Sequence, residues 1–161
     1  YNTDEPNHPS RPYGATFGHS LEWARFLLQH DESPLVESPS WLVEAADELT
    51  RRALDGGWEV DGRPGLVYTV DWEGDAVADV RLHWPVCEGI QAAAYLLRRT
   101  GDQHWEGWYR RLWDHAARYF IDENGAWRNE LDENMHQGTQ VWPGRPDVYH
   151  CTGALTTPLA V

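Results

Sequence analysis

The sequence predicts an all-α fold in which helices pair as hairpins and short β-hairpins occupy the connections. Four segments carry apolar residues at the spacing of a helix that buries one face. Both predicted helix pairs have tryptophans in this stripe, and the chain contains 10 of them. Aromatic stripes on successive pairs indicate that the pairs pack side by side in a toroid or solenoid rather than in an isolated bundle.

The first helix is predicted from about Gly18 to His30, after a loop rich in proline and glycine. The segment Asp31-Glu32-Ser33-Pro34 is expected to end it, because proline disfavours helix at the residue before it. A second helix should follow Ser40, a residue type that caps helix N-termini. Gly56-Gly57 should stop that helix.

The hydrophobic period changes to alternation between residues 66 and 84, which predicts a β-hairpin inside a connection. Pro85 suits the first position of a third helix, which is expected to end at Thr100-Gly101. Asp102 is then a candidate cap for a fourth helix with a wide aromatic stripe.

Beyond the fourth helix the sequence predicts little regular structure. Asn124-Gly125 is a strong turn signal and predicts a small hairpin near residues 119–131. Residues 132–150 read as loop, and the apolar segment that begins near Ala154 is too short for a full helix before the given sequence ends.

Composition excludes several classes of protein. The 161 residues suffice for one domain with a core, and a net charge of −13 argues against nucleic acid as a partner. All 13 basic residues other than histidine are arginines, so no lysine is present to form a Schiff base. No apolar run is long enough to cross a bilayer, and no secretory signal is seen, so we expect a soluble, cytoplasmic protein with no membrane partner. Cys87 and Cys151 are expected to be buried thiols.

The stretch Gly18-His19-Ser20-Leu21-Glu22 combines a helix start with two titratable side chains. If the helix begins near Gly18, His19 lies in its first turn and Glu22 follows three residues on along the same face. The glycines before it permit a sharp turn of the backbone. A histidine and a carboxylate therefore point together from the mouth of a helix.

Three polar clusters lie at predicted junctions between elements: His19 with Glu22, His83-Trp84-Pro85 with Glu88, and Asp147-Val148-Tyr149-His150. In a toroid, junctions at the same end converge on the axis, so we expect His19, Glu22, Glu88 and His150 to face one cavity. Histidines that titrate near neutral pH, supported by carboxylates, suit proton transfer in both directions. The other histidines are interpreted as capped or surface residues: His8, His30, His104, His115 and His136.

Two other interpretations of these residues stay open. Glu88 could serve only as a first-turn residue that complements the helix dipole. His19 and Glu22 could share a metal ion, but no third and fourth ligand stand at a telling spacing. We therefore expect no metal and no cofactor.

The ordered motifs are Arg11-Pro12-Tyr13-Gly14, Gly18-His19-Ser20-Leu21-Glu22-Trp23, Tyr68-Thr69-Val70-Asp71-Trp72, His83-Trp84-Pro85 with Glu88, and Trp142-Pro143-Gly144-Arg145-Pro146-Asp147-Val148-Tyr149-His150. As a set they resemble the N-acylglucosamine 2-epimerase superfamily, most of all its branch of aldose–ketose isomerases for mannose and sulfoquinovose. The resemblance covers nearly the whole chain. It implies an (α/α)6 barrel, of which residues 1–161 would form about the C-terminal half.

The resemblance also implies a metal-free sugar isomerase. The acid/base pair would be His19, from the GHxxE motif, and His150, which ends the PDxYH motif. Glu22 and Glu88 would orient these histidines or hold sugar hydroxyls.

Arg11 would contact the substrate, and the indole of Trp142 would hold the face of the sugar or pack in the core. In the implied reaction one histidine assists opening of the sugar ring. A histidine then removes the C2 proton to give a cis-enediol and returns it at C1, whereas the epimerases return it to C2 from the opposite face. Arg11 or an imidazolium would stabilise the enediolate oxygen.

One departure from the branch is Gly153, where its members commonly carry a glutamine nearby. The N-terminal half of the barrel would be missing, so we expect the 161 residues alone to be inactive and to need that half or a self-association partner. Rival interpretations are a 2-epimerase, a non-catalytic module that binds carbohydrate or protein, and a glycoside hydrolase that uses Glu22 and Glu88.

Overall fold

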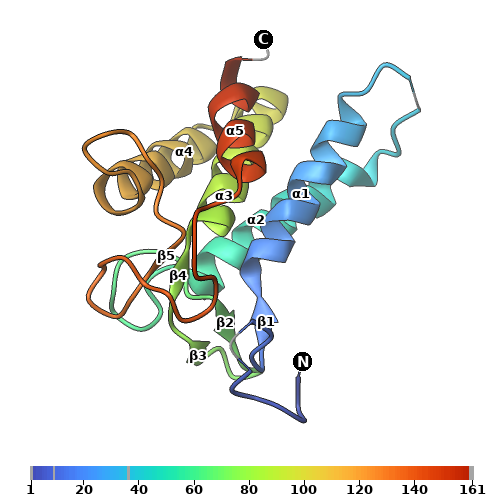
Figure 1. The fold of residues 1–161 in the computed structure, drawn as a ribbon. Helices are drawn as coiled ribbons and strands as arrows, with labels where there is room; N and C mark the ends of the chain where they lie inside the picture. The colour runs from blue at the N-terminus through green and yellow to red at the C-terminus, as the bar shows by residue number, and fades with distance from the viewer. Residues whose placement is uncertain (1, 9, 36, 160–161) are drawn as a thin grey trace.

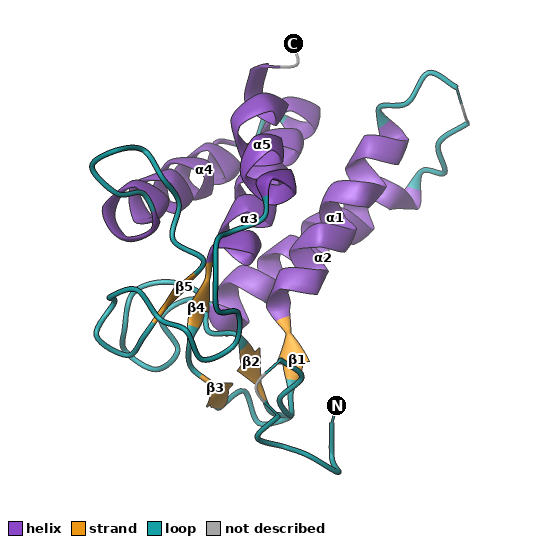
Figure 2. Ribbon diagram, viewed as in Figure 1, coloured by secondary structure: helices purple, strands orange, loops and turns teal. Residues whose placement is uncertain are grey.

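The computed structural model describes residues 2–8, 10–35 and 37–159. Helices dominate it, and the strands gather at one end of the helices (Figures 1 and 2). The helices are α1 (Phe17–Asp31), α2 (Trp41–Gly57), α3 (His83–Thr100), α4 (Gln103–His115) and α5 (Val148–Thr156), with a π-helical turn over Ala116–Phe120 and a 3-10 turn over Thr157–Leu159. The strands are β1 (Ala15–Thr16), β2 (Thr69–Val70), β3 (Ala76–Ala78), β4 (Arg81–Leu82) and β5 (Glu130–Leu131).

The helix α3 lies at the centre of the fold and packs against α1, α2, α4 and α5 (Figure 1). Its residues from His83 to Leu96 are buried, except for the half-buried Trp84. The small residues Gly89, Ala92 and Ala93 lie in this stretch and allow neighbouring helices to approach closely. The predicted helix pairs are confirmed, because α2 returns along α1 and α4 follows α3.

Local signals predicted most helix ends. Gly101 adopts a left-handed φ of 70° after α3, and the Asp102 side chain accepts a hydrogen bond from the His104 backbone N–H at 2.9 Å. Ser40 does precede α2, but its side chain makes no capping hydrogen bond. The predicted start of the third helix at Pro85 is wrong by two residues, because α3 begins at His83, directly after β4.

The strands differ in part from prediction. The hairpin within residues 66–84 is confirmed as β2 paired antiparallel with β3, but β4 leaves it and pairs with β5 from the later connection. In addition, β1 joins β2 from a segment predicted as loop. Both extra pairings are long-range, so the local pattern carried no signal for them. The second hairpin is reduced to one bridge, Ile121 with Trp127, around the turn at Gly125.

The loop predicted over residues 132–150 is confirmed as far as Asp147, but the prediction that no full helix follows is wrong. The helix α5 starts at Val148, six residues before Ala154. The Asp147 side chain caps it by accepting a hydrogen bond from the His150 backbone N–H at 3.0 Å. Cys151 and Ala154 are buried, and α5 packs on α3. A cap and tertiary packing therefore stabilise a helix that its own apolar pattern did not reveal.

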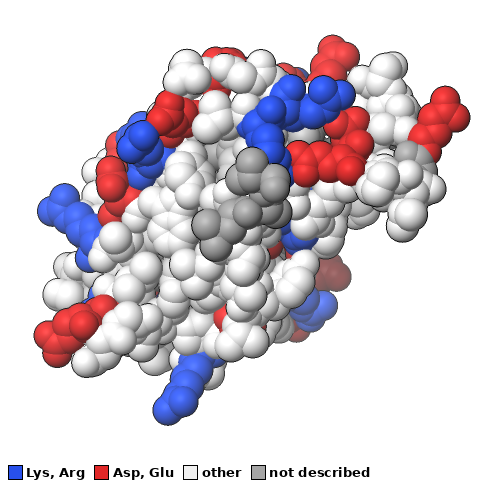
Figure 3. Space-filling view, turned by 90° about the horizontal axis from the view of Figure 1, so that it is seen from above, with Lys and Arg blue, Asp and Glu red and all other residues white. Residues whose placement is uncertain are grey.

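Charged side chains of both signs lie next to each other around a broad uncharged area on the face shown in Figure 3. Ion pairs join the end of α3 to the end of α1, with Arg98 2.9 Å from Glu32 and Arg99 2.6 Å from Asp31. None of the described helices combines the length and the apolar character that crossing a bilayer requires.

Candidate active site

A cavity of about 500 Å³ opens where the N-terminal ends of α1, α3 and α5 meet the connections. Its walls include the predicted residues His19, Glu22, His150 and Trp142. The sequence-based expectation that His19 and His150 share one hollow is thus met by the geometry. The other residues that line it are Ser10, Tyr68, His83, Trp84, Asn129, Arg145 and Asp147.

The indole of Trp84 is the common neighbour of the two histidines. Its ring centroid lies 5.2 Å from that of His19 and 5.6 Å from that of His150. Trp84 occupies the first turn of α3, His19 the first turn of α1 and His150 the first turn of α5. Three helix starts therefore bring these rings together, although Trp84 was not predicted to be part of the site.

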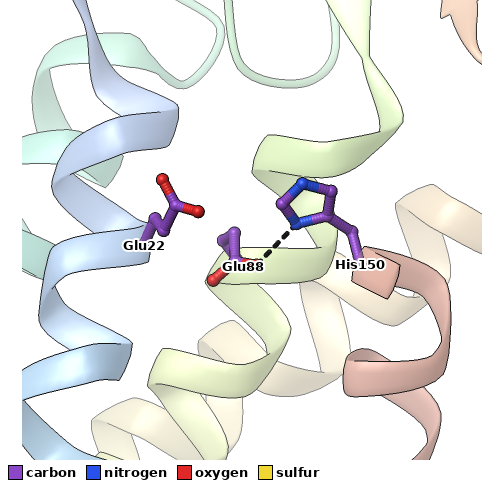
Figure 4. A group of neighbouring side chains, drawn as sticks. All are labelled: Glu22, Glu88 and His150. Carbon is purple, nitrogen blue, oxygen red and sulfur yellow. Dashed lines mark hydrogen bonds and ion pairs between the residues drawn. The ribbon is translucent and has the colours of Figure 1, made fainter. Parts of the chain in front are cut away.

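Glu88 holds the ring of His150 (Figure 4). The Nδ1 atom of His150 donates a hydrogen bond to Oε1 of Glu88 over 2.7 Å, and the Glu88 side chain is fully buried. Figure 4 shows the second ring nitrogen pointing away from Glu88, so it is free of this contact. A carboxylate that fixes one imidazole nitrogen sets the tautomer and leaves the other nitrogen to exchange protons.

Several charges act on His150. Burial disfavours its protonated form, but the hydrogen bond to Glu88 and the carboxylates of Asp147 and Glu22 outweigh burial and raise its pKa above 6.5. Glu22 extends from α1 toward Glu88 (Figure 4). The site thus combines a basic imidazole with acidic neighbours, which is the environment of a proton carrier.

Arg25 is a member of this cluster that the sequence analysis missed. Its Nε atom donates to Oε2 of Glu88, and Nη2 donates to the Tyr149 hydroxyl over 2.8 Å. Only 3% of the Arg25 surface is exposed. A signal was available, because Arg25 lies within the apolar stripe of Leu21, Ala24 and Leu28, where a charge requires a buried partner.

Three side chains of this cluster lie close enough to one another to be considered as metal ligands. Glu22, Glu88 and His150 each place one potential ligand atom within 4.8 Å of the others. However, Oε1 of Glu88 accepts from His150 and Oε2 accepts from Arg25. Both oxygens of Glu88 therefore have a cationic or N–H partner already, and we interpret the cluster as an ion-pair network.

His83 is buried at the back of the cavity and was not selected as a site residue. Its Nδ1 atom donates to the Asn129 backbone carbonyl at 3.1 Å. Its Nε2 atom lies 3.4 Å from Oδ2 of Asp147, and the ring is also close to the Cys151 thiol. His83 therefore supports the wall that carries the N-terminus of α5.

The loop that carries Trp142 is held from β5. The buried Glu130 carboxylate accepts three backbone N–H groups, from Gln140 at 2.6 Å, Val141 at 2.7 Å and Trp142 at 3.1 Å. The Asn129 side chain donates to the Trp142 carbonyl oxygen at 2.7 Å. Two neighbouring residues of the connection thus fix the wall that presents the Trp142 indole, which is about half exposed.

Two predicted site residues do not line the cavity. One is Glu88, which is fully buried and contacts His150 instead, and the other is Arg11. It is exposed and lines a second hollow, which shares Ser10, His19 and Tyr68 with the first cavity.

At Gly153, a Cβ atom would lie 2.5 Å from Oε1 of Gln91, so the Gln91 amide on α3 fills the space beside this glycine.

Three further predictions concern buried groups. His115 was predicted to be a capped or surface residue, but it is buried and packs against Trp58 and Tyr119. Burial, together with the charges of Arg81 and Arg111, lowers its pKa to about 4. Cys87 and Cys151 are buried free thiols, as predicted. The two thiols lie side by side. Burial raises the pKa of Cys87, whereas the hydrogen bond between the thiols lowers the pKa of Cys151.

The structure is a set of paired helices whose N-terminal ends converge on a histidine-lined cavity. The family model for N-acylglucosamine 2-epimerase (GlcNAc 2-epimerase) matches residues 1–154, and the chain belongs to this family. It is 51% identical over 163 residues to a D-mannose isomerase of Thermobifida fusca, and 44% identical to one of Pseudomonas cannabina pv. alisalensis. In both, the match covers 99% of this chain and 39% of the relative, so the chain spans well under half the length of these proteins.

Solved structures agree with this assignment. A crystal structure of D-mannose isomerase superposes with a TM-score of 0.87 and 31% identity, over 99% of this chain and 40% of the other. A cellobiose 2-epimerase from Bacillus thermoamylovorans B4167 gives a TM-score of 0.71 at 18% identity, over 91% of this chain and 37% of the other, and shares the fold. The predicted fold class is confirmed: the helix pairs form part of an (α/α)6 barrel.

Proposed function

We propose that this chain carries catalytic residues of an aldose–ketose isomerase that converts D-mannose to its ketose. Family membership and the D-mannose isomerase relatives support the reaction class. The observation that carries the proposal is the arrangement of His19 and His150, which both lie beside Trp84 in one cavity while Glu88 fixes the His150 ring. Two imidazoles facing one cavity provide the acid and base that an enediol mechanism needs.

In the proposed reaction His19 assists opening of the sugar ring by moving a proton between the ring oxygen and O1. His150 then takes the C2 proton on its free ring nitrogen. Electrons from the C2–H bond form the C1–C2 double bond while the C1=O π electrons move onto O1, which takes a proton from His19 to give a cis-enediol. The O2–H proton then returns to His19 as the C2=O bond forms, and His150 gives its proton to C1 to complete the ketose. Glu88 supports this role because it stabilises the imidazolium that forms when His150 accepts the proton.

The substrate contacts follow from the lining of the cavity. Glu22 offers a carboxylate to sugar hydroxyls, and the exposed indole of Trp142 offers an apolar face to C–H groups of the sugar. We assign Arg11 to the substrate entrance, because its hollow shares Ser10, His19 and Tyr68 with the cavity. A guanidinium there would stabilise negative charge on an enediolate oxygen.

We also propose that residues 1–161 act as the C-terminal part of a longer barrel. Large apolar residues on α1 and α5 support this, since Trp23 is 62% exposed and Val148 is 80% exposed. The partner would be the N-terminal half of the barrel or, failing that, a second copy. A reducing cytoplasm would suit the adjacent free thiols Cys87 and Cys151.

The test incubates D-mannose in D2O with a full-barrel protein that carries this chain. Ketose formation with deuterium at C1 is the expected result. His19→Gln and His150→Gln should each lower the rate by about 10²-fold or more, as is usual for a lost acid or base. His104→Gln, at an exposed histidine of α4, is the matched control and should keep full activity.

Other outcomes identify the rival functions. Deuterium at C2 of the epimeric aldose would make the protein a 2-epimerase that uses the same first step. Sugar binding without exchange, unchanged in both histidine variants, would make it a binding module and overturn the proposal. We expect the 161-residue chain alone to show no turnover.

A further inference from the structure

Arg25 is a buried cation that the proposed reaction does not use. It lies on the third turn of α1, with 3% of its surface exposed, and its guanidinium reaches Glu88 on α3 and the Tyr149 hydroxyl on α5. Nη1 also donates to Oε1 of Gln29 at 2.9 Å, so each guanidinium nitrogen has an acceptor. A buried charge with this many directed contacts is costly to desolvate and requires a reason beyond packing.

The contacts of Arg25 converge on His150. Glu88 accepts from Arg25 with one oxygen and from His150 with the other, while Tyr149 is the residue next to His150 in the chain. The Arg25 guanidinium carbon also lies 5.6 Å from the centroid of the Tyr149 ring. Arg25 therefore reaches His150 by two routes, one through a carboxylate and one through the backbone of α5.

We propose that Arg25 is a positioning residue for His150: it shares the negative charge of Glu88, and so leaves His150 able to release the proton that it accepts. Without Arg25, release of that proton would leave the fully buried Glu88 carboxylate with no cation beside it. The imidazolium would then be locked in place as the only counter-charge. With Arg25 present, Glu88 remains paired in both protonation states of His150.

The titratable groups near His150 come from three helices. They are Glu22 on α1, His83 and Glu88 on α3, and Asp147 and Tyr149 at the start of α5. Glu22, Glu88 and Asp147 favour the imidazolium. Arg25 opposes it, because a cation that shares the charge of Glu88 weakens the attraction of this carboxylate for His150. Removing Arg25 therefore has a defined sign: the midpoint of His150 titration must rise.

The inference rests on the proposed function only for the reason why His150 must release a proton. The first test measures the titration of His150 and needs no enzymatic activity. Nuclear magnetic resonance follows the His150 ring during a pH titration of the chain, with the signal assigned by its loss in His150→Gln. Arg25→Gln should raise the midpoint by about one pKa unit or more. Arg25→Lys, which keeps the charge, should return the midpoint to near the wild-type value.

A second variant covers the case in which Arg25→Gln does not fold. Gln29 is exposed on α1, and Gln29→Glu would place a second carboxylate beside Arg25, where it competes with Glu88 for the guanidinium. This variant should also raise the His150 midpoint. Gln103→Glu, at an exposed site on α4, is the matched control for added charge and should leave it unchanged.

An unchanged or lowered midpoint in folded Arg25→Gln overturns the inference. If that variant does not fold, an unchanged midpoint in Gln29→Glu overturns it. In a full-barrel protein the acid limb of the kcat/KM profile for mannose should move to higher pH in Arg25→Gln, whereas a purely structural role would lower activity equally at every pH. A shifted midpoint in a protein with no isomerase activity would keep the inference and refute the proposed function.

Discussion

The absence of a side chain at Gly18 makes room for Trp84. A Cβ atom at Gly18 would lie 2.4 Å from Cη2 of the Trp84 indole and 2.9 Å from Cγ of Pro85. The first turn of α1 can therefore approach the first turn of α3 closely, and this approach brings His19 beside the indole. Packing therefore explains the glycine of the GHxxE motif, because Gly18 lies within α1 and does not have a positive φ.

Gly18→Ala should destabilise the protein by about 1–3 kcal/mol, because the indole must move to admit a methyl group. Urea unfolding measures the change. The matched control is Gly107→Ala, within α4, where a Cβ atom meets nothing within 4 Å. That substitution should stabilise the protein by about 0.5–1 kcal/mol. Equal effects at the two glycines would contradict the role assigned to Trp84.

Stability should depend on the protonation of His150. Because the pKa of His150 is raised above 6.5 in the folded state, protonation of His150 stabilises the fold. This stabilisation is fully present below the pKa of the unfolded state and is lost as pH rises through the pKa of the folded state. The free energy of unfolding, measured in urea from pH 6 to pH 9, should therefore fall in this window. His150→Gln should flatten the fall, while His30→Gln, at an exposed histidine of α1, should keep it.

His115 should produce the opposite dependence. Its folded pKa of about 4 lies below the unfolded value of 6.5, so the unfolded chain binds the extra proton. Stability should decline by about 3 kcal/mol as pH falls from 6.5 to 4. Unfolding curves of His115→Gln should lack this part of the acid sensitivity, and those of the exposed-site variant His104→Gln should retain it.

Glu130 should be essential for the wall that carries Trp142. Glu130→Gln would turn an amide N–H₂ group toward backbone N–H donors, leave at least one unsatisfied, and cost about 2–3 kcal/mol. Hydrogen exchange at the amides of residues 140–142 should accelerate in the same variant. The control is Glu133→Gln, at an exposed site of the same connection. If exchange in this loop is equally slow in both variants, Glu130 does not hold it.

Helices α1 to α4 could be predicted because their signals are local. Gly101 and Asp102 stand side by side and end one helix and begin the next without help from the rest of the fold. The helix α5 could not be predicted in this way, since it depends on the Asp147 cap and on burial of Cys151 and Ala154 on α3. The same holds for the pairing of β4 with β5.

The site was predictable to the extent that topology places helix starts together. His19 and Glu22 follow from helical spacing, and the shared cavity with His150 follows from the convergence of junctions. Arg25 was not predicted because it lies inside an apolar stripe, away from the polar junctions between elements. His115 was misassigned because its burial depends on side chains from distant segments, including Trp58.

The contacts of α5 also determine when the site can form during folding. His150 meets Glu88 across 62 residues of chain, and Tyr149 meets Arg25 across 124. A growing polypeptide can form the first two hairpins before residue 147 has left the ribosome, but Glu88 and Arg25 then have each other and no imidazole. Competence to move a proton therefore requires residues 147–156 and the closure of a 124-residue loop, the longest that a hydrogen bond between described side chains spans.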